Sequence, residues 1–442
     1  MYIDKTTLYD LSVFNPQDDS SLFYLIDYTT TSEGKSELIQ ILHHPLNKID
    51  DIFDVQEILK QICDKIDHWP SEISNGTLLV IEKFFDDNPD PIPEEITHLQ
   101  AKFYKWIHPR DYALILFSMK QLFLLIKGYQ KIHQYFCQLH LPKPLAEIIS
   151  ETKRILSNKN LQLLADKNSF DELSQREILY FGRLFHVGLV QETRILIKRY
   201  GKLDAWYAMA RANKELSLNV PVFTNASTLI DASALRHLLL EDAVSYDIKM
   251  NKESNFIFLT GANMAGKSTL IKAVGLSVYM AHLGMGVPAH EMKLSLFEGL
   301  LSNINISDNI SKGESYFFNE VKRIKETIEK INDGRNWLVL IDELFKGTNI
   351  QDAMKCSTAV IRGLIKIKQC LFILSTHLYE IGEDLKDLPT IDFKYFETIL
   401  KESELHFSYQ LKDGISQDRM GYLILKKEGV ISLLENLGNQ QI

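Results

Sequence analysis

The chain has 442 residues and a formal net charge of −9 at pH 7, with hydrophobic and charged fractions that are ordinary for a globular protein. This acidic balance argues against a protein that coats nucleic acid without specificity, although it leaves room for a local basic face. The length is sufficient for two or three domains, and the opening residues lack the basic and apolar segments of a signal peptide.

Cysteine usage and hydropathy both indicate a cytoplasmic protein. The most apolar stretch, residues 113–126, is interrupted by Lys120 and Gln121 and is too short to cross a bilayer, so it predicts a buried helix and no membrane association. The cysteines have neither metal-ligand spacing nor a paired framework, which predicts reduced thiols at Cys63, Cys137, Cys356 and Cys370.

Helical periodicity dominates residues 1–220. Between residues 49 and 62, apolar side chains recur at steps of three and four residues, and Asn47 is a suitable N-cap. The proline-rich residues 86–95 predict a loop, and residues 141–144 predict the end of another helix. We therefore expect residues 1–220 to form a helical domain.

From residue 221 onward, short apolar runs alternate with helical segments. The runs NFIFLTG (255–261), NWLVLIDE (336–343) and CLFILSTH (370–377) show no polar alternation, which is typical of strands buried on both faces. Residues 221–442 are therefore expected to form an α/β domain with a mixed, largely parallel sheet. The fold class expected for the whole chain is multidomain α + α/β.

A glycine-rich segment follows the first of these runs. Residues 261–268 satisfy the pattern G-x-x-x-x-G-K-[ST], and a helical segment begins at Ser268. In this strand–loop–helix context, glycines allow backbone N–H groups to turn toward phosphates. The pattern predicts a nucleoside triphosphate site formed by Gly261, Ala262, Asn263, Met264, Ala265, Gly266, Lys267, Ser268 and Thr269.

The same pattern assigns chemical roles to single side chains. Lys267 is expected to place its charge on the β- and γ-phosphates, and the Ser268 hydroxyl to ligate Mg²⁺. Asp342, at the end of a predicted strand, is the second expected Mg²⁺ ligand, and Glu343 is the base that deprotonates the attacking water. His377 ends the next apolar run, where a γ-phosphate sensor would lie, although a lone histidine at a strand end is more often structural.

Residues 311–315, SKGES, lie between the glycine-rich segment and the two carboxylates. A helix is predicted to follow from Phe317, because an apolar stripe runs through Val321, Ile324, Ile328 and Ile331. The hydroxyl of Ser315 has two readings at this helix start. It is either a plain helix cap or, as in ATPases of the ABC type, an anion ligand that completes the site of the other subunit.

These segments closely resemble the MutS family of DNA mismatch-repair ATPases, which are themselves of the ABC type. The segment TGANMAGKST (260–269) is similar to the family's T-G-P-N-M-[GA]-G-K-S-T, in which the Asn-Met pair is distinctive. Further family segments resemble LRHLLLEDAVSYDI (235–248), which borders the family's adenine pocket, MAHLGMGVPA (280–289), DNISKGESYFFNE (308–320), LVLIDELFKGTN (338–349), STHLYEI (375–381) and LKDGISQDRMGYLILKKEGV (411–430). Together the matches cover residues 235–430.

The resemblance extends into the helical half. Residues 21–59 are similar to the opening of the family's core or lever domain, with Gly34, Pro45, Leu46 and Gln56 in register. The resemblance therefore implies a helical lever followed by an ABC-type ATPase domain.

The resemblance also implies a function. It implies Mg²⁺-dependent ATP hydrolysis at sites shared across a homodimer of ATPase domains, with Ser315 contacting the partner's phosphate, and a lever that binds mismatched or branched DNA. Val244 would pack on one face of adenine, and Tyr409 would replace a histidine that stacks on the other. Tyr409 also alternates on a predicted strand, so an ordinary core or surface role stays open for it.

Several positions depart from the family pattern. We expect no mismatch-recognition or connector domain before Leu8 and no C-terminal helix-turn-helix after Gly429, and residues 149–211 are short for a full DNA clamp. We therefore expect a short form with core and ATPase domains only, its clamp reduced or absent. Phe345–Lys346 replace the usual Gly-Arg, which predicts an altered contact between subunits.

Two other functions remain open. The acidic balance and the missing reader domains favour an ATP-driven module whose partner is another protein and which does not bind DNA directly. Another ABC-type branch, such as the chromosome-maintenance ATPases, is opposed by the lack of a long heptad coil and by the Asn263–Met264 pair.

Overall fold

The computed structural model describes residues 1–15, 20–87, 90, 92, 96–137, 139–225, 228–304, 316–401, 404–416 and 429–430. The chain divides into two compact units. Unit 1 consists of Met1–Leu25, His44–Ile52 and Leu216–Ile442, and unit 2 of Ile26–His43 and Phe53–Glu215. The change of unit at residue 216 lies close to the boundary expected at 220, whereas two N-terminal segments count with the later part of the chain.

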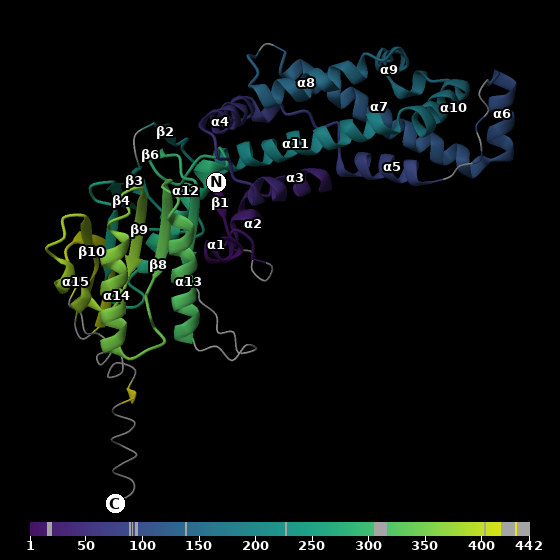
Figure 1. The fold of residues 1–442 in the computed structure, drawn as a ribbon. Helices are drawn as coiled ribbons and strands as arrows, with labels where there is room; N and C mark the ends of the chain where they lie inside the picture. The colour runs from purple at the N-terminus through teal and green to yellow at the C-terminus, as the bar shows by residue number, and fades with distance from the viewer. Residues whose placement is uncertain are drawn as a thin grey trace, which may run out of the picture. The chain divides into compact units, whose positions relative to one another are not determined.

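The described part of unit 2 contains helices and no strand (Figure 1). The helix predicted from periodicity over residues 49–62 is confirmed, since Ile52, Leu59 and Ile62 are fully buried on one side of it. The elements from residue 22 to 215 are α2 Leu22–Ile26, α3 Ser32–His43, α4 Ile49–Asp64, η1 Ile66–His68, α5 Asn75–Asp86, α6 His98–Ile107, α7 Pro109–Tyr135, α8 Lys143–Leu156, α9 Lys159–Ala165, η2 Phe170–Glu172, α10 Gln175–Arg183, η3 Leu184–Gly188 and α11 Val190–Glu215.

Helix α7 is longer than the sequence predicted, with 27 residues in place of the apolar stretch 113–126. Among the described helices it alone has the length and hydropathy that a membrane crossing would need. Most of its apolar side chains nevertheless pack inside the unit, and Leu122, Ile126 and Tyr129 are buried. The Tyr129 hydroxyl donates a hydrogen bond to the Leu196 carbonyl at 2.5 Å. This is the pattern of a core helix.

A buried carboxylate ties the start of unit 2 to its last helix. Asp204, on α11, is fully buried and accepts hydrogen bonds from the backbone N–H and the hydroxyl of both Thr30 and Thr31. Gly34 lies so close that a Cβ there would stand 2.1 Å from Asp204 Oδ2. Glycine at position 34 is therefore required by the approach of α3 to α11.

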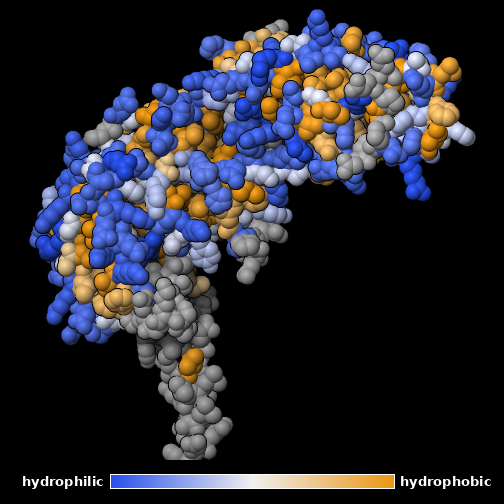
Figure 2. Space-filling model, turned by 45° about the vertical axis from the view of Figure 1, so that its right-hand side comes forward, coloured by the Kyte–Doolittle hydropathy of each residue, from blue (hydrophilic) through white to orange (hydrophobic). Residues whose placement is uncertain are grey.

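The outer side of α6 carries hydrophobic side chains that face solvent. Leu99, Phe103 and Trp106 are all more than half exposed, and their spacing of four and three residues places them on one face of the helix. Figure 2 shows hydrophobic side chains at the end of unit 2 where α6 lies. The described residues leave this stripe uncovered.

Unit 1 is built on a seven-stranded sheet of order β1-β7-β8-β9-β5-β10-β11 (Figure 1). All neighbouring strands are parallel except β10 and β11, so the expected mixed, largely parallel sheet is confirmed. The strands are β1 Tyr2–Ile3, β5 Phe256–Thr260, β7 Gly299–Asn303, β8 Trp337–Asp342, β9 Cys370–Ser375, β10 Ile391–Lys401 and β11 Glu404–Asp413. A second sheet of order β2-β6-β3-β4 contains β2 Val222–Thr224, β3 Leu229–Leu235, β4 Tyr246–Asn251 and β6 Glu291–Ser295.

Helices cover both faces of the central strands. On one face, α13 (Tyr316–Ile331), α14 (Ile350–Leu364) and α15 (Tyr379–Leu385) pack against side chains such as Phe258 and Val339. On the other face, α12 (Lys267–His282) packs against β8 and β9, and Gly275 approaches Leu340. This double coverage explains why the runs in β5, β8 and β9 lack polar alternation.

The N-terminal residues add a strand to this sheet. Tyr2 and Ile3 pair with Gly299 and Leu300 at the sheet edge, and α1 (Lys5–Asp10) follows directly. The fully buried Asp10 accepts hydrogen bonds from the Ser302 hydroxyl at 2.5 Å and the backbone N–H of residue 304 at 3.0 Å. Residues 1–10 are thus an integral part of unit 1. The hydropathy of this short segment alone did not indicate this role.

Candidate nucleotide-binding site

The predicted strand–loop–helix is present around the glycine-rich segment. Strand β5 ends at Thr260, and α12 begins at Lys267 with Gly266 as its N-cap. Gly261 and Gly266 have φ angles of +141° and +109°, which side chains of L residues rarely permit. The two glycines therefore allow the turn that directs the start of α12 toward the loop.

The side chain of Lys267 lies across this loop. Its ammonium donates to the carbonyls of Gly261 at 2.7 Å and Ala262 at 2.9 Å. The residue is buried, and burial lowers the pKa of the ammonium, although the nearby carboxylates of Glu343 and Asp342 raise it in part. A cation is thus held at the place where the motif requires one for phosphates.

The two predicted Mg²⁺ ligands are brought together from distant segments. Ser268 Oγ donates to Asp342 Oδ2 at 2.5 Å, and the Ser375 hydroxyl donates to the other oxygen of the same carboxylate. Asp342 ends β8, whose neighbour β9 ends at Ser375, so the sheet order creates the cluster. A hydroxyl and a carboxylate are hard oxygen ligands, and they fit Mg²⁺.

Glu343 is held by the side chains of His377 and Lys346. Its Oε1 lies 3.1 Å from His377 Nδ1, and its Oε2 lies 3.3 Å from Lys346 Nζ. The hydrogen bond from His377 lowers the pKa of Glu343 to about 2, with burial opposing and Lys346 assisting, and the same bond raises the pKa of His377. Glu343 also has a left-handed φ of +61°, a backbone strain that is common at functional sites.

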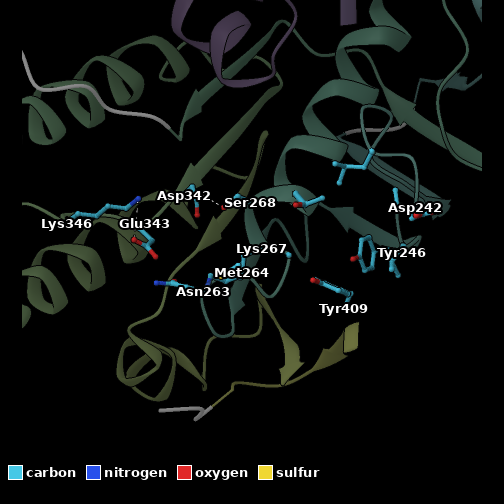
Figure 3. A pocket seen from close by; sticks show the side chains of 15 residues that line it. Asp242, Tyr246, Asn263, Met264, Lys267, Ser268, Asp342, Glu343, Lys346 and Tyr409 are labelled. Atoms are coloured by element: carbon cyan, nitrogen blue, oxygen red, sulfur yellow. Dashed lines mark hydrogen bonds and ion pairs between the residues drawn. The ribbon is translucent and has the colours of Figure 1, made fainter. Parts of the chain in front are cut away.

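A cavity of about 680 Å³ adjoins these groups (Figure 3). Val244 and Tyr409, the two residues expected around adenine, both line it together with the glycine-rich segment. Five lining residues were not named individually from the sequence, four of them in the segment around Val244 and one beyond Glu343: Leu240, Asp242, Ala243, Tyr246 and Lys346. Their proximity to Val244 and Glu343 was the available signal.

A β-bulge directs Tyr409 into the cavity. The register of β10 and β11 shifts between Phe396 and Thr398, and Tyr409 lies in the shifted segment with a φ of +53°. A bulge changes the direction of a side chain relative to strict alternation. The alternation along LHFSYQL, which suggested an ordinary strand position, therefore does not hold at residue 409.

The structure shows how the backbone accommodates Phe345 and Lys346, the residues at the positions of the family's Gly-Arg pair. Phe345 has a φ of +61°, the region that glycine adopts without cost, and its buried ring lies 5.6 Å from that of Phe317. The next two backbone N–H groups, of Lys346 and Gly347, donate to the buried carboxylate of Glu320 at 3.0 and 3.2 Å. Glu320 thus fixes the backbone after Glu343, a role that sequence reasoning did not foresee.

The remaining predicted residues have different outcomes. Ser315 and residues 311–314 lie outside the described residues. The helix predicted from Phe317 is present as α13, with Ile324 and Ile331 buried. Its stripe is only partly buried, because Val321 and Ile328 are 41% and 38% exposed.

Comparison with known proteins finds similarity to one family, over the ATPase part of the chain and beyond it. Residues 257–434 match the family model described as MutS domain V. The chain is 31% identical over 285 residues to the DNA mismatch repair protein MSH3 of Candida glabrata, covering 61% of this chain and 27% of that protein. It is 27% identical over 393 residues to the DNA mismatch repair protein MutS of Pseudothermotoga lettingae, covering 84% and 46%. The chain thus spans less than half the length of these relatives. These matches together support membership of the MutS family.

Proposed function

We propose that the chain hydrolyses ATP with the help of Mg²⁺. The observation that carries the proposal is the convergence of Lys267, the Ser268–Asp342 pair and Glu343 at one cavity, with His377 hydrogen-bonded to Glu343. Ser268 and Asp342 would hold the ion. Held there, the ion would supply positive charge that neutralises the phosphates.

The side chains divide the work of hydrolysis. Lys267 and the N-terminus of α12 would bind the phosphates, and His377 would lie near the γ-phosphate. Glu343 would orient a water and accept its proton while the water oxygen bonds to the γ-phosphorus and the bond to the ADP oxygen breaks. The products are ADP and phosphate. Val244 and Tyr409 would pack on the two faces of the adenine.

The wider proposal is an ATP-dependent DNA-binding protein of the MutS type. The relatives named above are DNA mismatch repair proteins, and the helical unit 2 has the place in the chain of a core or lever domain. We infer a cytoplasmic homodimer through the ATPase domains, with Ser315 acting across the dimer. ATP would favour one conformation, and the lever would transmit it to mismatched or branched DNA.

One observation favours a second function. The net charge of −9 is unusual for a surface that holds DNA by phosphate contacts alone. An ATP-driven module that binds another protein and does not touch DNA directly needs no basic surface and agrees with this charge.

The test is the rate of ATP hydrolysis by the wild type and by Glu343→Gln, measured with homoduplex, mismatched, four-way-junction and single-stranded DNA at several salt concentrations. We expect the wild type to hydrolyse ATP and the variant to be slower by about 10²- to 10⁴-fold. A rate change that is selective for one DNA and fades with salt supports DNA binding. Hydrolysis that ignores every DNA favours the protein-partner function, and equal rates in both proteins reject the proposed base.

A further inference from the structure

We propose that Lys346 exchanges between two anions, the Glu343 carboxylate that it contacts in this structure and the terminal phosphate of a nucleotide bound at residues 261–268. The exchange would free Glu343 to act as base only when a triphosphate is bound. This inference rests on the proposed ATP hydrolysis and assigns a positioning role to a residue within that site.

The geometry of Glu343 supports the first half of the exchange. Each of its carboxylate oxygens has its own partner, His377 on Oε1 and Lys346 on Oε2. The carboxylate is only 18% exposed, whereas the side chains of His377 and Lys346 are 54% and 37% exposed, so the anion is largely shielded from water while its two partners reach solvent. A carboxylate held in this way is poorly placed to accept a proton from water until one partner leaves.

The surroundings of Lys346 support the second half. Lys346 lines the same cavity as Lys267, Ser268 and Asn263, and Figure 3 shows its side chain on the Glu343 side of the glycine-rich segment. The charged groups facing Glu343 are Lys267, Lys346, His377 and the neighbouring Asp342. A terminal phosphate carries more negative charge than one carboxylate, so it competes effectively for the Lys346 ammonium.

The backbone of Lys346 is fixed by hydrogen bonds, whereas its side chain reaches solvent. The buried Glu320 accepts the backbone N–H of Lys346 at 3.0 Å and that of Gly347 at 3.2 Å, which fixes the position of Cα. The side chain is 37% exposed and has a four-carbon stem with several rotatable bonds. A fixed backbone with a mobile cation is what an exchange between two nearby anions requires.

The exchange predicts that Lys346 distinguishes nucleotides with and without a terminal phosphate. In Lys346→Met, we expect the Kd for Mg²⁺-AMPPNP to rise about tenfold, as for loss of one charge-assisted contact, and the Kd for Mg²⁺-ADP to change less than about twofold. Lys346→Arg keeps the charge and should restore most of the AMPPNP affinity. Lys355→Met, at an exposed position of α14, is the matched control and should change neither constant.

Hydrolysis separates this inference from the proposed function. At saturating ATP, Lys346→Met should keep a kcat within about threefold of wild type, because Glu343 is already free, while KM rises. If the ratio of the Kd values for AMPPNP and ADP is the same in Lys346→Met as in the wild type, the exchange is overturned, even if the wild type hydrolyses ATP. A wild type without activity, in which Glu343→Gln makes no difference, rejects the proposed function itself.

Discussion

The hydroxyl of Ser268 lies 2.5 Å from Asp342 Oδ2, although the two residues are 74 positions apart in the chain. One residue is in the first turn of α12, and the other ends β8. The parallel order of β8, β9 and β5 brings both to the carboxyl edge of the sheet, where ligands of open α/β sheets bind. The pair provides two oxygen ligands of the kind that Mg²⁺ takes.

Asp342→Asn should therefore weaken the response to Mg²⁺. The amide loses the negative charge that attracts the ion, so we expect the Mg²⁺ concentration for half-maximal ATP hydrolysis to rise about tenfold or more. A magnesium titration of the initial rate measures this. Asp384→Asn, at an exposed position of α15, provides the matched control. An Asp342→Asn protein with a normal magnesium titration would contradict the assignment.

Tyr409→Ala should weaken nucleotide binding, because the bulge places this ring at the cavity beside the glycine-rich segment. Stacking of a base on an aromatic ring contributes about 1–3 kcal/mol, which corresponds to a rise of about 5- to 150-fold in the Kd for ATP. Tyr409→Phe keeps the ring and should bind nearly as well. Equal affinity of the alanine variant and the wild type, measured by calorimetry, would return Tyr409 to an ordinary strand role.

His282 should make unit 1 sensitive to acid. The buried ring accepts the Phe297 N–H on Nε2 at 3.1 Å and donates from Nδ1 to the Val278 carbonyl at 2.8 Å, which requires the neutral form. Burial lowers its pKa to about 4, so between pH 6.5 and 4 the unfolded chain binds a proton that the folded chain does not. Its contribution to stability is present above pH 6.5 and is lost as the pH falls toward 4, by up to about 1.4 kcal/mol per pH unit.

The acid sensitivity is measured by urea unfolding of the whole chain at pH 7.5 and pH 5, followed by a probe in unit 1. His237, whose pKa burial also lowers to about 4, contributes in the same direction. His282→Gln should be less stable at pH 7.5 and should lose less stability than the wild type on acidification. An identical loss in both proteins would assign the acid effect to other groups.

Asp204→Asn should destabilise unit 2. The backbone N–H groups and hydroxyls of Thr30 and Thr31 donate four hydrogen bonds to this buried carboxylate. In the asparagine variant, the side-chain NH₂ group would lie opposite some of these donors and could not accept their hydrogen bonds. Leaving buried donors unpaired costs about 1–3 kcal/mol. Hydrogen exchange at the amides of Thr30 and Thr31 should accelerate by the same free energy. Asp171→Asn, at an exposed position, is the comparison and should leave this exchange unchanged.

Much of the fold could be predicted because its signals are local. The apolar runs that became β5, β8 and β9, and the glycine-rich turn before α12, are each encoded within a few adjacent residues. The addition of Tyr2 and Ile3 to the sheet could not be predicted, because a two-residue strand has no periodicity and is defined only by its partner β7. The full length of α7 was underestimated because polar residues flank its apolar centre.

The sequence by itself determined the phosphate-binding turn, the order of the carboxylates and the family, because spacing along the chain carries that information. Only the tertiary structure decided which side chains meet: Ser268 with Asp342, Glu343 with His377 and Lys346, and the backbone of Lys346 with Glu320. These contacts depend on strand order, and the position of Tyr409 at the cavity depends on the bulge in β11; both result from the packing of the whole unit. Such packing leaves no periodic or motif signal at the residues themselves.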